Sequence, residues 1–187
     1  VALGAWTRLA DAGLGCPDWP GCYGFVTIPV SPEEIDIANS KFPDTPYEVA
    51  KAIPEVVHRY FAAALGFFIV CIAYLAVRSK DVPTNIRNLS IFLLAWVIMQ
   101  GTFGYWTVSL KLWPQVVTTH LMSGFLTTAL LWLLYFKTKD LLESRARWNF
   151  EISTKRLFNI SIALVAVQIF LGAWTSTNYA SYSCTDF

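Results

Sequence analysis

Residues 56–77 read VVHRYFAAALGFFIVCIAYLAV, a stretch in which only His58 and Arg59 are strongly polar. A run of about 20 mostly apolar residues is long enough to cross the hydrocarbon core of a bilayer as an α-helix. Three further stretches meet the same criterion, at about residues 89–108, 116–136 and 157–175. The sequence therefore predicts an all-α, polytopic membrane helix bundle.

The composition indicates a chain whose surface contacts a lipid bilayer rather than only water. Of the 187 residues, 55% are hydrophobic and 14% are charged, whereas a soluble domain usually has about a quarter charged residues. Aromatic residues reach 16% and include eight tryptophans, which suits a chain with two membrane interfaces. The net charge of +1 gives no basic excess of the kind that favours binding to nucleic acid.

The chain opens with VALGAWTRL, which we interpret as the last turns of an incomplete first helix. There is no initiator methionine and no signal-peptide pattern, so we expect the sequence to be a piece of a longer protein.

Charge in the connecting segments predicts the orientation. The segment of about residues 9–54 has seven acidic and two basic residues, whereas basic residues exceed acidic ones around 78–87 and 137–156. By the positive-inside rule the two basic loops face the cytoplasm and the 9–54 loop faces outward.

Three of the four cysteines, Cys16, Cys22 and Cys184, fall in segments predicted to face outward. Cys16 and Cys22 frame the short sequence CPDWPGC, and in an oxidising compartment a disulfide is the natural state of such a pair. A zinc site is less favoured, because no second cysteine pair or nearby histidine completes four ligands. Cys71 lies within an apolar helix, where a cysteine is usually a small buried apolar residue.

The chain contains an internal repeat. LGAWT occurs at residues 3–7 and again at 171–175, and a partial copy, GYWT, occupies 104–107. Trp at an interface and Gly at a helix contact are common in membrane proteins. However, Cys16 and Cys184 each follow the glycine of their copy by twelve residues, which indicates a true repeat.

The repeat predicts two domains. Residues 1–156 would form a four-helix unit, and residues 157–187 would begin a second, pseudo-symmetric unit, in which Cys184 pairs beyond the end of this chain.

The two histidines, His58 and His120, are predicted to lie at the same depth. Each follows a proline, Pro54 or Pro114, near the start of a helix that enters from the outer side, and proline is favoured in a first helical turn. Two imidazoles on alternate helices of a bundle can hold a haem iron from both sides. The alternative is that each is an interfacial histidine hydrogen-bonded to a neighbouring helix.

Three further charged residues are candidates for the same site. Glu55 precedes His58 by three residues, shares its helix face and is predicted to point into the same cavity. Arg59 is predicted to turn away from that face, and Arg8 ends the first helix. Either arginine could pair with a haem propionate, or could instead extend toward lipid headgroups.

These residues resemble the haem A synthase family of cytochrome oxidase assembly proteins. TRL at 7–9 with GLGCPDWPGCYG at 13–24 is similar to the first outer loop of that family, and EVVHR at 55–59 resembles its E-x-x-H-R motif. His120 matches the second histidine of the amino-terminal half. The resemblance covers the whole chain.

The resemblance implies an eight-helix protein of two four-helix halves in a bacterial inner membrane, with its cysteine loops on the periplasmic side. The amino-terminal half, present here, would oxidise the C8 methyl of haem O to a formyl group, giving haem A for cytochrome c oxidase. The other half would bind a haem b cofactor. Haem O synthase and cytochrome oxidase assembly factors are the expected partners.

The resemblance also implies roles for individual residues. His58 and His120 would be axial ligands of the substrate haem, and Glu55 an essential carboxylate beside it. The Cys16–Cys22 disulfide would have a redox or structural role. Because this chain lacks most of the first helix and nearly all of the second half, we expect it to be inactive alone.

Three other functions compete with this interpretation. A b-type electron-transfer cytochrome would use the same two histidines, and a haem carrier would bind haem without catalysis. A membrane thiol–disulfide oxidoreductase would instead use Cys16, Cys22 and Cys184. The type of haem bound distinguishes them.

Overall fold

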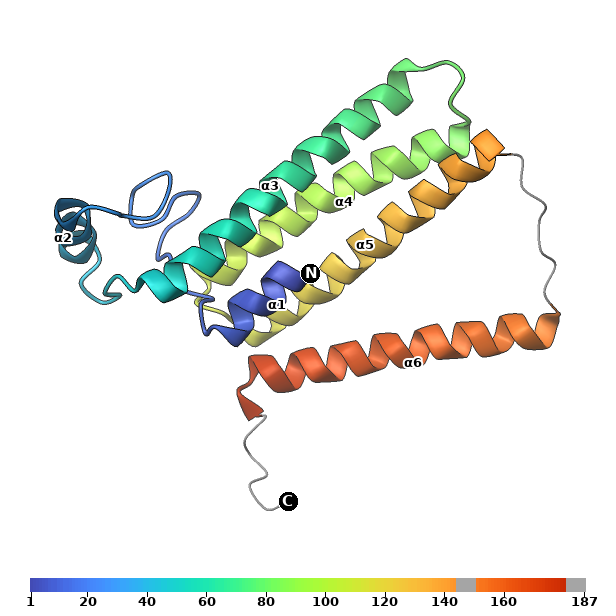
Figure 1. Ribbon diagram of the computed structural model, residues 1–187. Coiled ribbons are helices and arrows are strands. Elements are labelled where there is room, and N and C mark those ends of the chain that lie inside the picture. The colour runs from blue at the N-terminus through green and yellow to red at the C-terminus, as the bar shows by residue number, and fades with distance from the viewer. Residues whose placement is uncertain (144–150, 181–187) are drawn as a thin grey trace.

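The computed structural model describes residues 1–143 and 151–180, and long helices dominate this part of the chain (Figure 1). The helices are α1 (Ala2–Leu9), α2 (Pro32–Lys41), α3 (Val49–Arg78), α4 (Thr84–Ser109), α5 (Pro114–Glu143) and α6 (Ile152–Thr177). Helices α3, α4, α5 and α6 are each long and apolar enough to cross a membrane. The predicted all-α, polytopic fold is confirmed.

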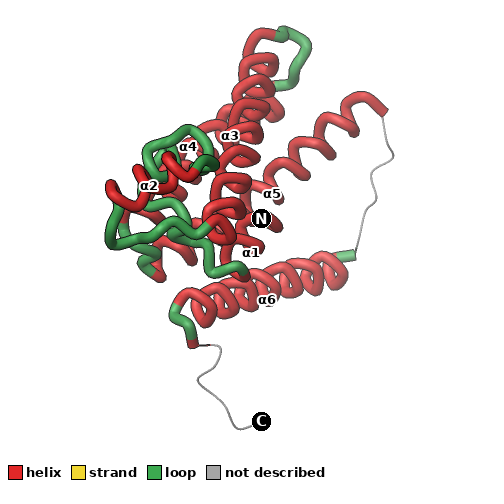
Figure 2. The backbone as a smooth tube through the Cα atoms, turned by 60° about the vertical axis from the view of Figure 1, so that its left-hand side comes forward, coloured by secondary structure: helices red, strands yellow, loops and turns green. Residues whose placement is uncertain are grey.

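Helices α1, α3, α4 and α5 form one bundle. Helix α3 packs on α4, α4 packs on α5, and the short α1 packs on α3 (Figures 1 and 2). An apolar cluster of Ile69, Ile86, Leu93 and Leu134 fills the inner part of the bundle. Helix α6 touches α5 near its own carboxyl end and otherwise lies apart, so Ala173 and Thr177 are its buried residues.

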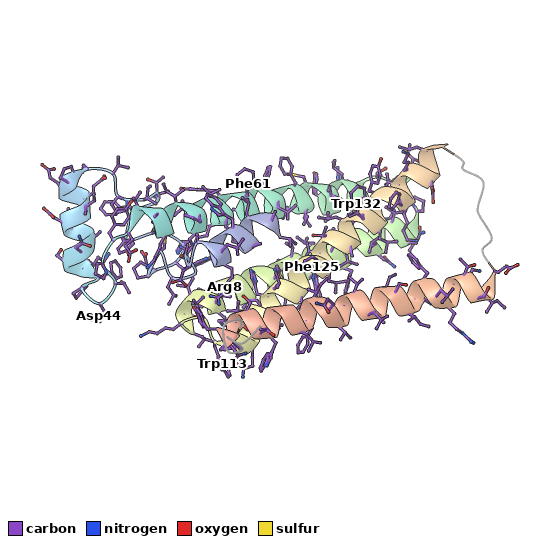
Figure 3. The ribbon with its side chains drawn as sticks, turned by 60° about the horizontal axis from the view of Figure 1, so that its bottom comes forward. Arg8, Asp44, Phe61, Trp113, Phe125 and Trp132 are labelled. Atoms are coloured by element: carbon purple, nitrogen blue, oxygen red, sulfur yellow. A yellow bond between two sulfur atoms is a disulfide. The ribbon has the colours of Figure 1, made fainter. Side chains whose placement is uncertain are left out.

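The outer surface of the bundle is apolar. Large side chains such as Phe61, Phe68 and Trp132 are more than half exposed, and side chains project outward along every long helix (Figure 3). A soluble monomer rarely exposes apolar surface on this scale, whereas contact with lipid chains requires it. The chain is therefore an integral membrane protein.

The start of α3 corrects one expectation. Pro54 is not in the first turn, because the helix begins at Val49 and Pro54 lies inside it. Proline cannot donate the backbone hydrogen bond of that position. The helix nevertheless extends outward, because Ala52 is fully buried in a cluster with Cys16. The other long helices also extend past the predicted spans, by at most about two turns at either end.

Helix α2 was not predicted, although the sequence carries a signal for it. The Ser31 hydroxyl accepts a hydrogen bond from the Glu34 N–H (3.2 Å), and the Glu34 carboxylate accepts from the Ser31 N–H (3.0 Å), which is a capping box. Hydrogen bonds from the N–H groups of Val30 and Ser31 lower the pKa of Glu34 below its ordinary value. Ala38 of α2 packs against the cysteine loop, so the outer segment is folded.

Candidate functional site

A cavity of about 1220 Å³ lies within the bundle beneath the cysteine loop. Its volume exceeds the roughly 300–1,000 Å³ of most small-molecule sites. His58, His120, Glu55, Arg59 and Arg8 all line it, so the structure brings the five predicted site residues to one space. The cavity is therefore large enough for a big, mostly apolar ligand.

The two imidazoles reach the cavity from α3 and α5. His120 Nδ1 is buried and has no hydrogen-bond partner within the described residues, and no side chain or backbone group described here bonds to the His58 ring. Buried polar atoms without a partner are uncommon in folded proteins. The alternative of two interfacial histidines bonded to neighbouring helices therefore gains no support from the described residues.

The set of donor groups fits haem better than a bare metal ion. Across residues 1–143 and 151–180, no three side chains of His, Cys, Asp or Glu gather to hold a metal. Two imidazoles suffice for a haem iron, because the porphyrin supplies the remaining ligands. The assignment of His58 and His120 as axial ligands stays a prediction.

Polar contacts hold α4 and α5 together at the level of His120. Gln100 Nε2 donates to the backbone carbonyl of His120 (2.9 Å), and the Ser123 hydroxyl donates to Gln100 Oε1. Trp96 Nε1 donates to the Ser123 carbonyl (3.2 Å). The backbone that carries His120 is thus fixed from the neighbouring helix.

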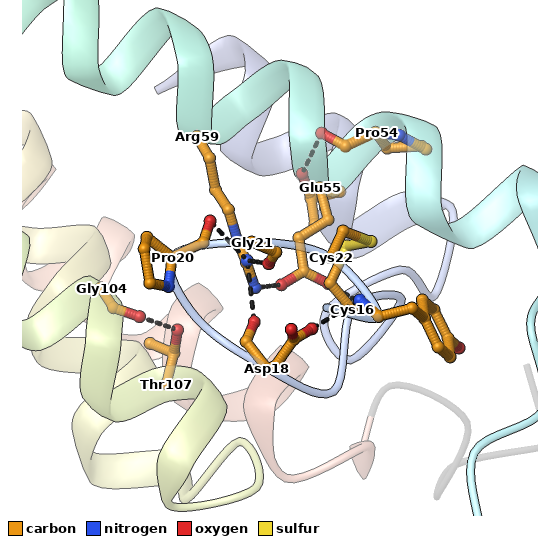
Figure 4. A network of polar contacts seen from close by, with 12 residues as sticks. Cys16, Asp18, Pro20, Gly21, Cys22, Pro54, Glu55, Arg59, Gly104 and Thr107 are labelled. Atoms are coloured by element: carbon orange, nitrogen blue, oxygen red, sulfur yellow. Dashed lines mark hydrogen bonds and ion pairs between the residues drawn. A yellow bond between two sulfur atoms is a disulfide. The ribbon is translucent and has the colours of Figure 1, made fainter. Parts of the chain in front are cut away.

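Glu55 and Arg59 fasten the cysteine loop to the start of α3 (Figure 4). Glu55 is 5% exposed; one oxygen accepts from the Cys16 N–H (2.9 Å) and the other forms an ion pair with Arg59. The Arg59 guanidinium also donates to the backbone carbonyls of Asp18 (2.9 Å) and Gly21. We call Glu55, Arg59 and residues 16–22 the loop clasp.

The loop clasp corrects a second expectation. Arg59 does not turn away from Glu55, because residues four apart on a helix are neighbours and the long arginine side chain reaches back to the carboxylate. The guanidinium that was a candidate for a haem propionate is already bonded within the loop clasp. A propionate contact of Arg59 stays a prediction.

The cysteine loop is held by a disulfide and by hydrogen bonds within the loop. The expected Cys16–Cys22 disulfide is present, and both cysteines are fully buried. The Asp18 carboxylate accepts from the N–H groups of Tyr23 (2.6 Å) and Gly24 (2.7 Å), which closes the turn that follows. Cys71 is a free, half-buried residue of α3. Cys184, which was predicted to pair with a cysteine beyond the end of this chain, lies outside the described residues.

Arg8 links α1 to the end of α6. Its Nε donates to the Ser176 hydroxyl (3.1 Å), and the guanidinium lies 4.2 Å from the centre of the Tyr179 ring. Figure 3 shows Arg8 beside that end of α6. Because Arg8 also lines the cavity, its propionate contact stays a prediction.

Two glycines at the site were seen in the sequence only as members of the repeat. A methyl group at Gly4 would lie 3.5 Å from Cε1 of His58, and one at Gly104 would lie 3.3 Å from Cε1 of His120. The GAWT and GYWT copies marked these positions, but spacing alone did not reveal which side chains they contact.

Comparison with known proteins places the chain in a family. The whole chain, residues 1–187, matches the COX15-CtaA family of cytochrome oxidase assembly proteins. The chain belongs to this family. No solved structure matches the chain.

Curated members of the cytochrome oxidase assembly family are similar along nearly the whole chain. A protein of Shewanella oneidensis named heme A synthase is 43% identical, over 99% of this chain and 55% of its own length. Heme A synthases of a Wolbachia species and of Rhizorhabdus wittichii are 27% and 26% identical, over 94% and 98% of this chain and 57% of their own lengths. The chain thus spans about half the length of the curated relatives it matches.

Proposed function

We propose that this chain is the haem O-binding half of a haem A synthase, an oxidoreductase that converts the C8 methyl of haem O to the formyl group of haem A. One observation carries the proposal: His58 and His120 line a single cavity of about 1220 Å³, and a ring nitrogen of His120 is buried without a partner among the described residues. The similarity to proteins named heme A synthase supports the choice of this reaction.

In this proposal each group of site residues has its own role. His58 and His120 bind the haem iron, which fixes the macrocycle in position. Residues 18–21 of the loop clasp, together with Glu55 and Arg59, line the cavity. Glu55 lies beside the bound haem, with its charge balanced by Arg59. Oxidation of one methyl among several requires such fixed orientation, and a haem site depends on the protein for it.

Helix α6 and the following residues begin the second half in this proposal. Support comes from the LGAWT copy at its carboxyl end and from the exposure of nearly all its surface. A second four-helix unit, with a haem b cofactor, would cover that surface. Haem O synthase would deliver the substrate, and assembly factors would receive the product for cytochrome c oxidase.

The thiol–disulfide alternative is weakened by burial. Thiol exchange needs a sulfur that an attacking thiolate can reach, and Cys16 and Cys22 are both fully buried in the loop cluster. A b-type electron-transfer cytochrome uses the same imidazoles, so the test must identify the haem.

The test is to express the full-length gene product in a host that makes haem O but has no haem A synthase, and to extract the haems. We expect haem A in the membranes and haem O or haem A in the purified protein. Cells with the empty vector are the control. Haem b alone would favour the electron-transfer cytochrome, and a protein without haem would overturn the proposal.

We also propose that the cysteine loop faces the periplasm across a bacterial inner membrane. The support is the excess of basic residues in the opposite loops. Asp36 and Lys155 are both exposed, so Asp36→Cys should react with an impermeant maleimide in intact cells, and Lys155→Cys only after permeabilisation. The parent chain measures labelling of the native cysteines, and the opposite labelling pattern would reverse the orientation.

A further inference from the structure

We propose that Gly4 and Gly104 are positioning residues that set the orientation of the His58 and His120 imidazoles by letting each ring lie against a neighbouring helix backbone. The inference rests on the proposed function only in taking haem as the ligand of the two rings. It assigns the glycine of the repeated motif a role.

The two contacts have the same geometry. From a methyl group at Gly4, Cε1 of His58 would be 3.5 Å away and its two nitrogens 3.9 and 4.0 Å away. From a methyl group at Gly104, Cε1 of His120 would be 3.3 Å away and both nitrogens 3.9 Å away. Each glycine therefore faces the carbon between the two ring nitrogens, so pressure there would turn the ring whichever nitrogen binds the iron.

The same motif supplies both glycines. Gly4 begins GAWT on α1, which packs on α3, and Gly104 begins GYWT on α4, which packs on α5. Each motif thus lies on the helix adjacent to the one that bears the histidine. The third copy, at Gly172 on α6, has no atom of the described residues within 4 Å of the position of its added methyl.

These steric contacts matter because no group of the described residues restrains either ring through a hydrogen bond. A metal-bound histidine almost always donates its second ring nitrogen to a carboxylate, carbonyl or water, which fixes the ring orientation. Within the described part of the chain, His120 Nδ1 has no such partner and the His58 ring forms no hydrogen bond. Packing against the glycines is the restraint that the structure provides instead.

Helix propensity alone predicts that replacing either glycine with alanine stabilises its helix, so a loss of haem binding would have to come from the contact with the ring. Alanine is favoured over glycine inside a helix, so Gly104→Ala should not destabilise α4 through its backbone. At 3.3 Å the new methyl is closer than an ordinary contact, and the His120 ring must move. At Gly4 the distance of 3.5 Å is an ordinary contact, so Gly4→Ala should be milder and Gly4→Val more severe.

The experiment measures the low-spin ferric EPR spectrum of the full-length gene product, since the g values of bis-imidazole haem depend on ring orientation. Subtracting the spectrum of His120→Ala isolates the haem bound in this half. We expect Gly104→Ala to shift the largest g value and to weaken binding of added haemin by about 10-fold. Gly4→Ala should give a smaller shift than Gly4→Val. Gly172→Ala is the matched control: after subtraction of the Gly172→Ala/His120→Ala spectrum, the haem bound in this half should keep its g values.

The outcomes separate the two proposals. Unchanged g values and haemin affinity in both Gly104→Ala and Gly4→Val would overturn the positioning role. If the glycine variants shift the spectrum but the wild-type protein yields no haem A, the positioning role would be supported and the synthase proposal overturned. If Gly104→Ala does not fold, the graded pair at Gly4 decides the question by itself.

Discussion

Replacing His58 or His120 with alanine is expected to abolish the low-spin bis-imidazole spectrum of the haem bound in this half. Haem A formation should fall by more than about 100-fold, because even outer partners of metal-bound histidines are worth about 10–100-fold. Both rings line one cavity, so neither can replace the other. Optical and EPR spectra, together with extraction of the haems, measure both effects.

Neighbouring substitutions provide the control for these histidine variants. Val57 and Thr119 each adjoin a histidine and do not line the cavity, so Val57→Ala and Thr119→Ala should keep the wild-type spectrum and product. Added imidazole should partly restore the low-spin spectrum of His58→Ala or His120→Ala by occupying the vacated ligand position. Normal haem A output from either histidine variant would exclude it as an essential ligand.

Replacing Glu55 with glutamine should separate haem binding from conversion. Glutamine keeps the side-chain shape and can still accept from the Cys16 N–H, but it removes the negative charge beside Arg59. We expect haem to bind with its low-spin spectrum largely retained, while haem A formation falls by about 100-fold or more, as for the loss of a catalytic carboxylate. Extracted haem O and haem A are quantified against bound haem.

Arg59→Gln is the matched variant for Glu55→Gln, because it breaks the same ion pair and leaves the carboxylate in place. Removing one partner of a buried pair costs about 3–5 kcal/mol, so both variants should lower thermal stability. If Glu55 also acts on the substrate, its variant must lose much more product than Arg59→Gln. Equal losses would limit Glu55 to its part in the loop clasp.

The fold was predictable because membrane helices depend on long apolar runs, and four such runs were evident. The exact ends of these helices were not, because contacts beyond the apolar run also determine them. Ala52 is buried against the cysteine loop, which extends α3 past Pro54. Helix α2 is short and polar, so only its capping box at Ser31 and Glu34 signalled it.

The grouping of the five candidate residues around one cavity was predictable, whereas their contacts were not. Periodicity along α3 correctly placed Glu55 and His58 at one cavity. A spacing of four residues also makes Arg59 a neighbour of Glu55. It could not show that the same guanidinium bonds to carbonyls of a loop some 40 residues earlier. The contacts of Gly4 and Gly104 likewise join separate helices, which a single sequence does not reveal without homologues.

The loop clasp couples the folding of the cysteine loop to that of the start of α3. The Cys16 N–H and the carbonyls of Asp18 and Gly21 satisfy Glu55 and Arg59 only when the loop has its closed shape. The Cys16–Cys22 bond secures that shape. During synthesis the loop leaves the ribosome before α3, so the Cys16–Cys22 bond can form before Glu55 and Arg59 are in place to bond to the loop.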